Sequence, residues 1–204
     1  MIAVVDYGMG NLRSVSKALE RLGASARVTS DPRDIERADK VIVPGVGAFP
    51  AAMRELTGRK LVEPIKSAVA SGKPYLGICL GLQLLFDRSD EGEGAKGLGI
   101  LPGAVRRFAV APPLKIPHMG WNQIARAAGR ADRPVLKGIE DGSFFYFVHS
   151  YYADPADRGV VALQADYGRP FAAMVWRDRL FATQFHPEKS QERGLRLLEN
   201  FLSV

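Results

Sequence analysis

Residues 74–87 read PYLGICLGLQLLFD, and this stretch decides the fold because it joins a buried strand to a helix. Its first part is short and apolar, which is typical of a strand in the core of a sheet. Its second part places three large apolar side chains on one stripe of a helix, namely Leu82, Leu85 and Phe86. The sequence therefore predicts a sharp strand-to-helix turn near residue 79.

A single cysteine occupies the tip of this predicted turn. Cys79 has a glycine two residues before it, Gly77, and another two residues after it, Gly81. Glycine lets neighbouring backbone approach closely, and the turn holds its middle residue in a strained conformation. A sulfur at a helix N-terminus is favoured as a thiolate by free N–H groups and by the helix dipole. The alternative is that Cys79 is a small buried apolar residue, and the rest of the sequence must decide between the two.

Length and composition indicate an ordinary globular protein. The chain has 204 residues, 47% of them hydrophobic and 25% charged, so we expect one domain over residues 1–204. One cysteine excludes an intramolecular disulfide, and no stretch predicts a signal peptide or a membrane helix, so we expect a cytoplasmic protein. The net charge of +6 comes from scattered arginines, which favours a solvated basic surface over a nucleic-acid site.

The first half of the chain alternates strands and helices. Apolar runs predict strands at residues 2–5, 25–29 and 40–43, and periodic patterns predict helices at 12–22, 48–57 and 59–71. A further short helix is predicted to begin at Asp31 and Pro32. This alternation predicts a parallel sheet covered by helices on both faces.

Two glycine-rich loops follow strands of this sheet. The loop that contains Gly8 and Gly10 lacks the third glycine of a dinucleotide fingerprint and the lysine of a P-loop, so we interpret it as a tight connection. Residues 44–49, PGVGAF, lie where open α/β sheets bind ligands, at the carboxyl end of a strand. Their backbone N–H groups are candidates for binding an oxyanion.

The second half changes character and predicts an antiparallel part of the sheet. Residues 88–99 are polar and glycine-rich and predict a loop. Short strands are predicted at 104–108, 143–148, 159–165, 171–177 and 180–185, followed by a helix over 191–202. Together the two halves predict an open α/β fold with a mostly parallel, mixed central sheet flanked by helices.

A histidine and a glutamate follow the last predicted strand. His186 and Glu188 are two residues apart, and Pro187 between them biases His186 to an extended backbone. With this spacing Glu188 can accept from one ring nitrogen while the other faces a thiol, which is the arrangement of a nucleophilic triad with Cys79. His149 is another candidate base, but it has no carboxylate within two residues and follows a run of aromatics, so we interpret it as a pocket wall. His118, between Pro117 and Met119, is a weaker candidate. The spacing of these residues does not fit a zinc site, and we expect neither a metal nor a cofactor.

At this point the motifs resemble a known family. GICLGLQ at residues 77–83 together with HPE at 186–188 is similar to the class I (triad) glutamine amidotransferases. Five further segments resemble the glutaminase subunits of imidazole glycerol phosphate synthases within that family: DYGMGNL at 6–12, PGVGAF at 44–49, HMGWN at 118–122, FVHSY at 147–151 and HPEKS at 186–190. The resemblance covers the whole chain in order, and it implies the single-domain fold of that family with a nucleophile elbow.

The resemblance also implies a role for each residue of the site. Cys79 is expected to attack the side-chain amide of glutamine, His186 to protonate the departing ammonia and Glu188 to hold the imidazole. The oxyanion hole is expected at the N–H of Leu80 and at the loop of Gly45, Val46 and Gly47. The substrate glutamine is expected to contact five residues: Gln83, Glu91, His149, Ser150 and Tyr151.

A partner is implied as well, since ammonia loses its nucleophilicity when water protonates it. The resemblance implies a heterodimer with a cyclase subunit, a (β/α)8 barrel that uses ammonia to form imidazole glycerol phosphate and an aminoimidazole carboxamide ribotide in histidine biosynthesis. Four residues match positions expected at that interface, namely Asn11, Trp121, Tyr146 and Lys189. Their alternatives are a helix cap for Asn11, core aromatics for Trp121 and Tyr146, and a solvated charge for Lys189.

Two other functions remain open from the sequence. One is a glutaminase that serves another acceptor, such as anthranilate or pyridoxal phosphate synthesis; the segment at 118–122 argues against it. The other is a non-catalytic binding module of the same fold, and the presence of Cys79, His186 and Glu188 argues against that.

Overall fold

The centre of the protein is a sheet of eight strands in the computed structural model, which describes residues 1–127 and 134–204. In spatial order the strands are β2 (Ala26–Thr29), β1 (Ile2–Val5), β3 (Lys40–Gly45), β4 (Tyr75–Cys79), β14 (Leu180–Thr183), β13 (Pro170–Arg177), β12 (Val161–Asp166) and β9 (Ala125–Arg126). The strands from β2 to β14 pair in parallel, whereas β13, β12 and β9 pair antiparallel. The predicted mixed, mostly parallel sheet is therefore confirmed.

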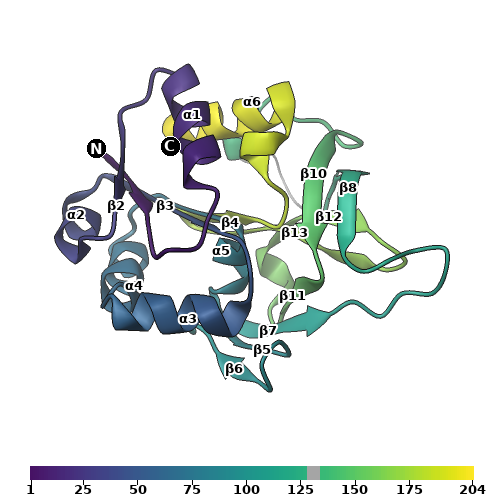
Figure 1. Cartoon of the computed structure of the whole chain (residues 1–204). Helices are drawn as coiled ribbons and strands as arrows, with labels where there is room; N and C mark the ends of the chain where they lie inside the picture. The colour runs from purple at the N-terminus through teal and green to yellow at the C-terminus, as the bar shows by residue number, and fades with distance from the viewer. Residues whose placement is uncertain (128–133) are drawn as a thin grey trace.

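Helices cover both faces of this sheet (Figure 1). One face carries α1 (Leu12–Arg21) and α6 (Gln191–Leu202), and the other carries α2 (Pro32–Arg37), α3 (Phe49–Gly58) and α4 (Val62–Ala70). Each lies within a few residues of its predicted range. No helix in the two described parts of the chain is long and apolar enough to cross a bilayer.

Strand β1 shows why two layers of helices form. Its four residues are all buried, so no side of the strand can face water. Ile2 and Val4 join the core that contains α1 and α6, while Ala3 and Val5 join the core beneath α2, α3 and α4. Successive side chains of a strand point to opposite faces, so an unbroken apolar run requires a hydrophobic layer on each side.

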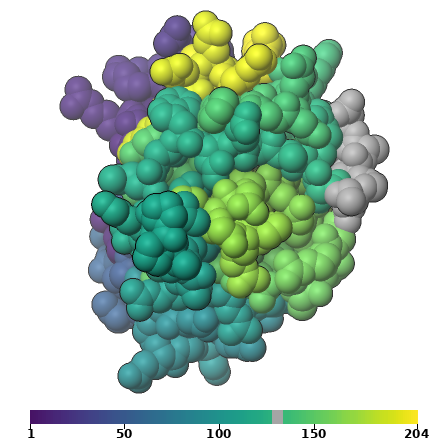
Figure 2. Space-filling model, turned by 90° about the vertical axis from the view of Figure 1, so that its right-hand side faces the viewer, coloured from purple at the N-terminus to yellow at the C-terminus, as the bar shows by residue number. Residues whose placement is uncertain are grey.

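Two smaller sheets flank the central one. A two-stranded sheet pairs β10 (Phe144–His149) with β8 (His118–Gln123), and a four-stranded sheet has the order β11 (Tyr151–Pro155), β7 (Leu101–Arg107), β5 (Phe86–Ser89) and β6 (Ala95–Lys96). The described residues also form three 3₁₀ turns, η1 (Pro134–Leu136), η2 (Arg158–Val160) and η3 (Pro187–Lys189). Figure 2 views the side of the molecule that is formed mainly by the second half of the chain.

The structure corrects the sequence predictions around these small sheets. The helix after Cys79 is a single turn, α5 (Leu80–Gln83), and Phe86 begins strand β5 instead of continuing the helix. Residues 88–99 are not simply a loop, because they contain the rest of β5 and all of β6. Strands β8 and β11 were not predicted either. In each case pairing with a strand distant in sequence, such as Phe86 with Leu101, overrides the local pattern.

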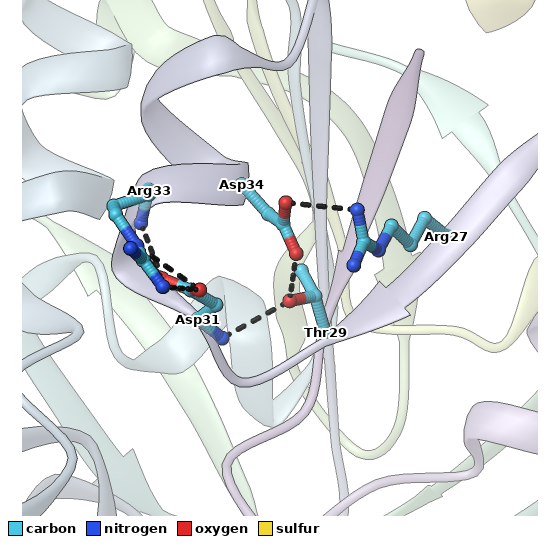
Figure 3. Close-up of polar contacts among 5 residues, drawn as sticks. All are labelled: Arg27, Thr29, Asp31, Arg33 and Asp34. Carbon is cyan, nitrogen blue, oxygen red and sulfur yellow. Dashed lines mark hydrogen bonds and ion pairs between the residues drawn. The ribbon is translucent and has the colours of Figure 1, made fainter.

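A polar corner between β2 and α2 fixes the edge of the central sheet (Figure 3). Thr29 donates to Asp34 at 2.6 Å and accepts from the backbone N–H of Asp31 at 3.0 Å. Asp31 caps α2 by accepting from the N–H of Arg33, and the helix begins at Pro32, as the sequence predicted. Asp34 also pairs with the Arg27 guanidinium at 3.1 Å. The buried hydroxyl of Thr29 therefore joins the strand end to the helix start.

Replacing the Thr29 hydroxyl should destabilise the protein through the corner between β2 and α2 alone. Thr29→Val leaves the N–H of Asp31 and one carboxylate oxygen of Asp34 without their partner, so we expect the free energy of unfolding to fall by about 1–3 kcal/mol. Urea denaturation followed by circular dichroism measures it. Thr57→Val, at an exposed position of α3, is the matched control and should change stability by less than about 0.5 kcal/mol. Equal stability of the two variants would contradict the role given to Thr29.

Candidate active site

The turn after β4 holds Cys79 in a strained backbone conformation. Its φ of 54° and ψ of −103° lie outside the regions that non-glycine residues ordinarily adopt, at a cost of about 1–3 kcal/mol. A Cβ at Gly77 would lie 2.6 Å from the carbonyl oxygen of Gly81, and a Cβ at Gly81 would lie 1.9 Å from that of Val43. Both glycines are therefore required by close backbone contacts, as the sequence predicted.

The short helix α5 removes one argument for an activated thiol. A single turn of four residues carries little of the dipole that a longer helix provides, so the expected stabilisation of a thiolate by a helix N-terminus is not supported. Any stabilisation of negative charge on the sulfur must come mainly from side chains. Cys79 itself is only 6% exposed, so these side chains must lie in the core of the protein around it.

Parallel pairing of β4 with β14 brings the predicted base to the cysteine. Thr183 is opposite Ile78 in the register, so the chain leaves β14 beside the turn and places His186 there. Nδ1 of His186 lies 2.8 Å from Oε1 of Glu188, and both side chains are 1% exposed. The remaining ring nitrogen, Nε2, is buried and has no hydrogen-bond partner in the described part of the chain.

The charge state of His186 follows from three neighbouring effects. Burial lowers its pKa, but the negative sulfur of Cys79 and the carboxylate of Glu188 outweigh burial, so the pKa lies above its ordinary value. A protonated imidazole in turn stabilises negative charge on Cys79. The pair is arranged to act as a nucleophile together with a proton donor.

A small pocket of about 270 Å³ opens beside the sulfur. Its lining includes every predicted substrate residue: Gln83, Glu91, His149, Ser150 and Tyr151. It also includes Cys79, and three of the four predicted oxyanion residues, Val46, Gly47 and Leu80. The volume lies at the low end for ligand sites, which fits a ligand the size of an amino acid.

The fourth oxyanion residue, Gly45, lies just behind this lining. It is paired with Cys79 across β3 and β4, and a Cβ here would lie 2.3 Å from the Tyr7 hydroxyl oxygen and 2.8 Å from Cβ of Leu80. Gly47 has a φ of 98°, a conformation that favours glycine. The loop can lie against the turn because Gly45 has no side chain, and Gly47 allows the backbone conformation that follows.

Two predicted substrate residues have fixed hydrogen-bonding capacity. Nε2 of Gln83 donates to the Tyr151 carbonyl at 3.0 Å and to Oε1 of Gln184 at 3.2 Å, so only its oxygen remains to accept from a ligand. Oε2 of Glu91 accepts from the N–H of Phe49 at 2.8 Å, at the start of α3. Both side chains therefore offer acceptors to the pocket, which suits a cationic or N–H group of a ligand.

The two remaining histidines form a buried pair. His118 and His149 are opposite each other in the β8–β10 register, and Nδ1 of His118 lies 3.0 Å from Nε2 of His149. Nδ1 of His149 lies 2.8 Å from the Tyr151 carbonyl, which can only accept, so this nitrogen carries the proton. Burial lowers the pKa of His118 to about 4 and that of His149 to about 3. Both rings are therefore neutral at pH 7. Both ring nitrogens of His149 are also already hydrogen-bonded, to His118 and to the Tyr151 carbonyl, which agrees with its interpretation as a pocket wall.

Three of the four predicted partner residues gather on one surface. Trp121 is 47% exposed and meets Tyr146 edge to face, with 6.1 Å between ring centroids. Nζ of Lys189 lies 5.8 Å from the Tyr146 ring centroid. Trp121 is therefore not a core aromatic. Asn11 precedes α1, whose packing reaches η3, but its side chain makes no capping hydrogen bond.

One buried residue of the site was missed from the sequence. Gln184 is fully buried, and its Nε2 lies 3.6 Å from Sγ of Cys79. The available signal was a polar residue inside the apolar run that leads to His186. Within the two described ranges, no group of histidine, cysteine and carboxylate side chains is arranged to hold a metal ion.

The chain is similar to known proteins along nearly its whole length. The family model described as "Glutamine amidotransferase class-I" matches residues 3–204. Proteins named "Imidazole glycerol phosphate synthase subunit HisH" are 56% identical in Syntrophotalea carbinolica, over 98% of each chain, and 55% identical in Rhodopirellula baltica, over 100% of this chain and 98% of the relative. The relative of the same name in Bacillus cereus is 52% identical over 100% and 95%.

Solved structures share the fold at lower identity. One titled "Crystal structure of glutamine amidotransferase" has a TM-score of 0.76 at 22% identity and covers 100% of this chain and 98% of its own. Another, "Structure of PurLQS from Thermotoga maritima", has a TM-score of 0.73 at 22% identity over 99% and 97%. At this level of identity the structures support the fold alone.

The close contact at the turn gives a first test of the site. Gly77→Ala should lower the free energy of unfolding by about 1–3 kcal/mol, since the new methyl group is forced against the Gly81 carbonyl, and it should displace the sulfur. Urea denaturation and the rate of Cys79 alkylation by iodoacetamide measure the two effects. Gly58→Ala, where a Cβ meets nothing within 4 Å, is the control and should leave both unchanged or raise stability slightly. Similar behaviour of the two variants would contradict the requirement for glycine at 77.

The buried histidine pair gives a second test, through pH. The folded-state pKa of each ring is below the unfolded value of about 6.5. As pH falls from about 6.5 towards 4, these rings therefore become protonated in the unfolded chain but not in the folded chain. Stability should therefore fall over this range, by at most about 1.4 kcal/mol per pH unit for each histidine. Urea titrations at several pH values measure the slope.

The matched variant for the pH test is His118→Asn, which keeps an N–H donor near the position of Nδ1 but does not titrate. It should reduce the slope to about half, because one of the two rings remains. A slope that does not change in the variant would show that other groups cause the acid sensitivity.

Proposed function

Because the chain belongs to the class I glutamine amidotransferase family, we propose that it is the glutaminase subunit of an imidazole glycerol phosphate synthase. One observation carries the catalytic part of this proposal: a strained cysteine lies beside a histidine that a buried carboxylate orients, at the edge of a small pocket. The relatives that carry the HisH name at 50–56% identity support the choice of synthase.

In the first half of the reaction, the thiolate of Cys79 attacks the side-chain amide carbon of glutamine. The carbonyl oxygen becomes an oxyanion, which the N–H of Leu80 and one N–H of the Gly45–Gly47 loop stabilise. One such donor contributes about 2.7–4 kcal/mol in comparable sites. His186 gives its proton to the nitrogen, the C–N bond breaks and ammonia leaves a γ-glutamyl thioester. This step is supported by the raised pKa of His186, which supplies a proton donor at neutral pH.

In the second half, His186 removes a proton from water, which attacks the thioester carbon. The C–S bond breaks, glutamate leaves and Cys79 returns to the thiolate beside a protonated His186. Glu188 holds Nδ1 throughout, so the ring keeps Nε2 towards the reacting atoms. No cofactor takes part, because both steps are acyl transfers that a triad supports.

Substrate binding uses the acceptors of the pocket. The carboxylate of Glu91 and the oxygen of Gln83 suit the ammonium group of glutamine. The Tyr151 carbonyl already accepts two hydrogen bonds, so any backbone contact of Ser150 and Tyr151 to the substrate uses N–H groups, which suits the α-carboxylate. His149, neutral and held by two hydrogen bonds, forms part of the pocket wall.

The ammonia passes to a cyclase subunit that forms a (β/α)8 barrel, and the two chains make a heterodimer in the cytoplasm. Support for a partner comes from exposed apolar side chains on β8 and β10 and just before β8: Ile116, Met119, Trp121 and Phe144. Clustered exposed apolar residues mark interaction surfaces. Trp121, Tyr146 and Lys189 belong to this interface in the proposal, and Asn11 lies at its edge.

The proposal is tested by glutamine hydrolysis by the purified chain, titrated with the cyclase subunit and its nucleotide. We expect slow hydrolysis alone and activation by about tenfold or more in the complex, because unregulated hydrolysis wastes glutamine and binding of the partner is expected to turn a backbone N–H of the oxyanion loop towards the reacting carbonyl. Failure of the complex to form, or equal turnover with and without the cyclase, would contradict the assignment to this synthase. Activation by the synthase of another pathway would indicate a different acceptor.

The nucleophile is tested by Cys79→Ser in the complex. Glutamine-dependent synthesis should fall by a factor on the order of 1,000 or more, since a hydroxyl is a much weaker nucleophile here. Synthesis from added ammonium salts should survive, because it uses only the cyclase. Loss of both activities would mean that Cys79 serves folding or assembly, and retention of the glutamine-dependent activity would contradict the mechanism.

A further inference from the structure

We propose that Gln184 is a further residue of the catalytic machinery, whose side-chain N–H donates to the sulfur of Cys79 and stabilises it as an anion. This inference rests on the proposed function, since it concerns the same nucleophile. Gln184 lies one residue beyond β14, is 0% exposed, and places Nε2 3.6 Å from Sγ. Within the described residues the sulfur has one other hydrogen bond, a weak one of 3.9 Å in which the thiol donates to the Val148 carbonyl.

Neighbouring hydrogen bonds fix which end of the Gln184 amide faces the sulfur. The Tyr151 carbonyl can only accept, so the nitrogen of Gln83 must lie towards it, at 3.0 Å. The second hydrogen of that nitrogen then needs an acceptor, and Oε1 of Gln184 lies 3.2 Å away. With its oxygen committed to Gln83, Gln184 presents its NH₂ group to Cys79. An amide rotated the other way would place two NH₂ groups against each other.

The histidine pair continues this chain of hydrogen bonds, and its proton positions are fixed in the same way. Nδ1 of His149 also donates to the Tyr151 carbonyl, and Nε2 of His149 accepts from His118. Asn122 donates to Nε2 of His118 at 3.3 Å. Every member therefore has one allowed direction, and the direction at Gln184 is set by groups that do not change charge near neutral pH.

The chemistry of the cycle needs such a donor. A thiolate accepts a hydrogen bond far better than a thiol, so a fixed N–H favours the anion. The one-turn helix α5 supplies little dipole, and His186 alternates between its charged and neutral forms as it moves protons. Gln184 remains neutral and in place throughout, and it is available again when the thioester breaks and the sulfur recovers its negative charge.

Few ionisable groups face the sulfur, which makes a pH experiment interpretable. Among the described residues they are His186 just before η3, with Glu188 behind it, Tyr7 after β1, His149 from β10, and Glu91 across the pocket. Burial and the negative sulfur raise the pKa of Tyr7, and burial lowers that of His149, so neither changes charge around pH 7. Any change that a Gln184 variant causes in the pH profile of the thiol is then attributable to the lost donor and its effect on the Cys79–His186 pair.

The test measures the rate of Cys79 alkylation by iodoacetamide against pH in the full-length chain, together with kcat and KM for glutamine. Gln184→Met keeps length and volume but has no N–H. It should move the rise of the alkylation rate to higher pH by roughly one unit and reduce kcat by roughly tenfold or more, with KM within about threefold. Gln184→Glu keeps an oxygen for Gln83 and adds negative charge, so it should shift the profile further in the same direction.

Two controls separate this role from a structural one. Thr183→Val, one residue before Gln184, removes a buried hydrogen bond from the hydroxyl to the Phe185 carbonyl, and this hydrogen bond does not involve the sulfur. It should lower the melting temperature and leave the alkylation profile in place. Gln83→Met removes the N–H group of residue 83 that orients the Gln184 amide. We therefore expect the alkylation profile to move to higher pH by less than in Gln184→Met. If the Gln184 variants do not fold, Gln83→Met still tests the inference.

The outcomes distinguish this inference from the proposed function. Gln184 variants whose alkylation profiles coincide with the wild-type profile would overturn the inference and leave the glutaminase intact. A wild-type chain without glutaminase activity in any complex, whose cysteine reacts like a simple thiol, would overturn the function itself. The role of Gln184 would be established if the alkylation profile moves to higher pH in Gln184→Met, moves further in Gln184→Glu, and keeps the wild-type position in Thr183→Val.

Discussion

The structure depends on how closely backbone approaches backbone at one strand-to-helix turn. Cys79 adopts a positive φ between two glycines, and neither glycine has space for a methyl group, because carbonyl oxygens of Gly81 and Val43 fill those positions. This contact stores strain of about 1–3 kcal/mol, which the surrounding buried strands must offset. It places a sulfur at the carboxyl edge of the sheet, where strands β3 and β14 supply the loop and the base on either side.

Buried polar groups around this turn are organised by the direction of their hydrogen bonds. The Tyr151 carbonyl accepts from Gln83 and from His149, and these two donors fix the orientation of an amide and of an imidazole. Burial keeps the His118–His149 pair neutral, whereas the sulfur and Glu188 keep a proton on His186. Three histidines of one small protein thus take two charge states, because only His186 has a carboxylate at one ring nitrogen and the charge of the Cys79 sulfur acting on the ring.

The pocket is placed at the junction of three sheets. The central sheet provides Cys79, β10 ends at its wall with His149, and β11 begins with Tyr151. Strand β8 continues this arrangement outward, since its register with β10 sets His118 against His149 in the interior and Trp121 against Tyr146 at the surface. In the proposed complex, the antiparallel pair of β8 and β10 therefore connects the glutamine pocket with the surface that binds the cyclase.

The sequence by itself determined the parallel half of the sheet, the turn at Cys79 and the His186–Glu188 pair, because these follow from local periodicity and fixed spacing. It did not determine that the helix after Cys79 stops at Gln83, nor that strands form at Phe86 and at His118, since those depend on partners far along the chain. Only the tertiary structure showed Gln184 against the sulfur and the two other histidines against each other. Such contacts depend on the pairing of distant strands and on which polar atoms are buried away from water. A local sequence pattern encodes neither the pairing nor the burial.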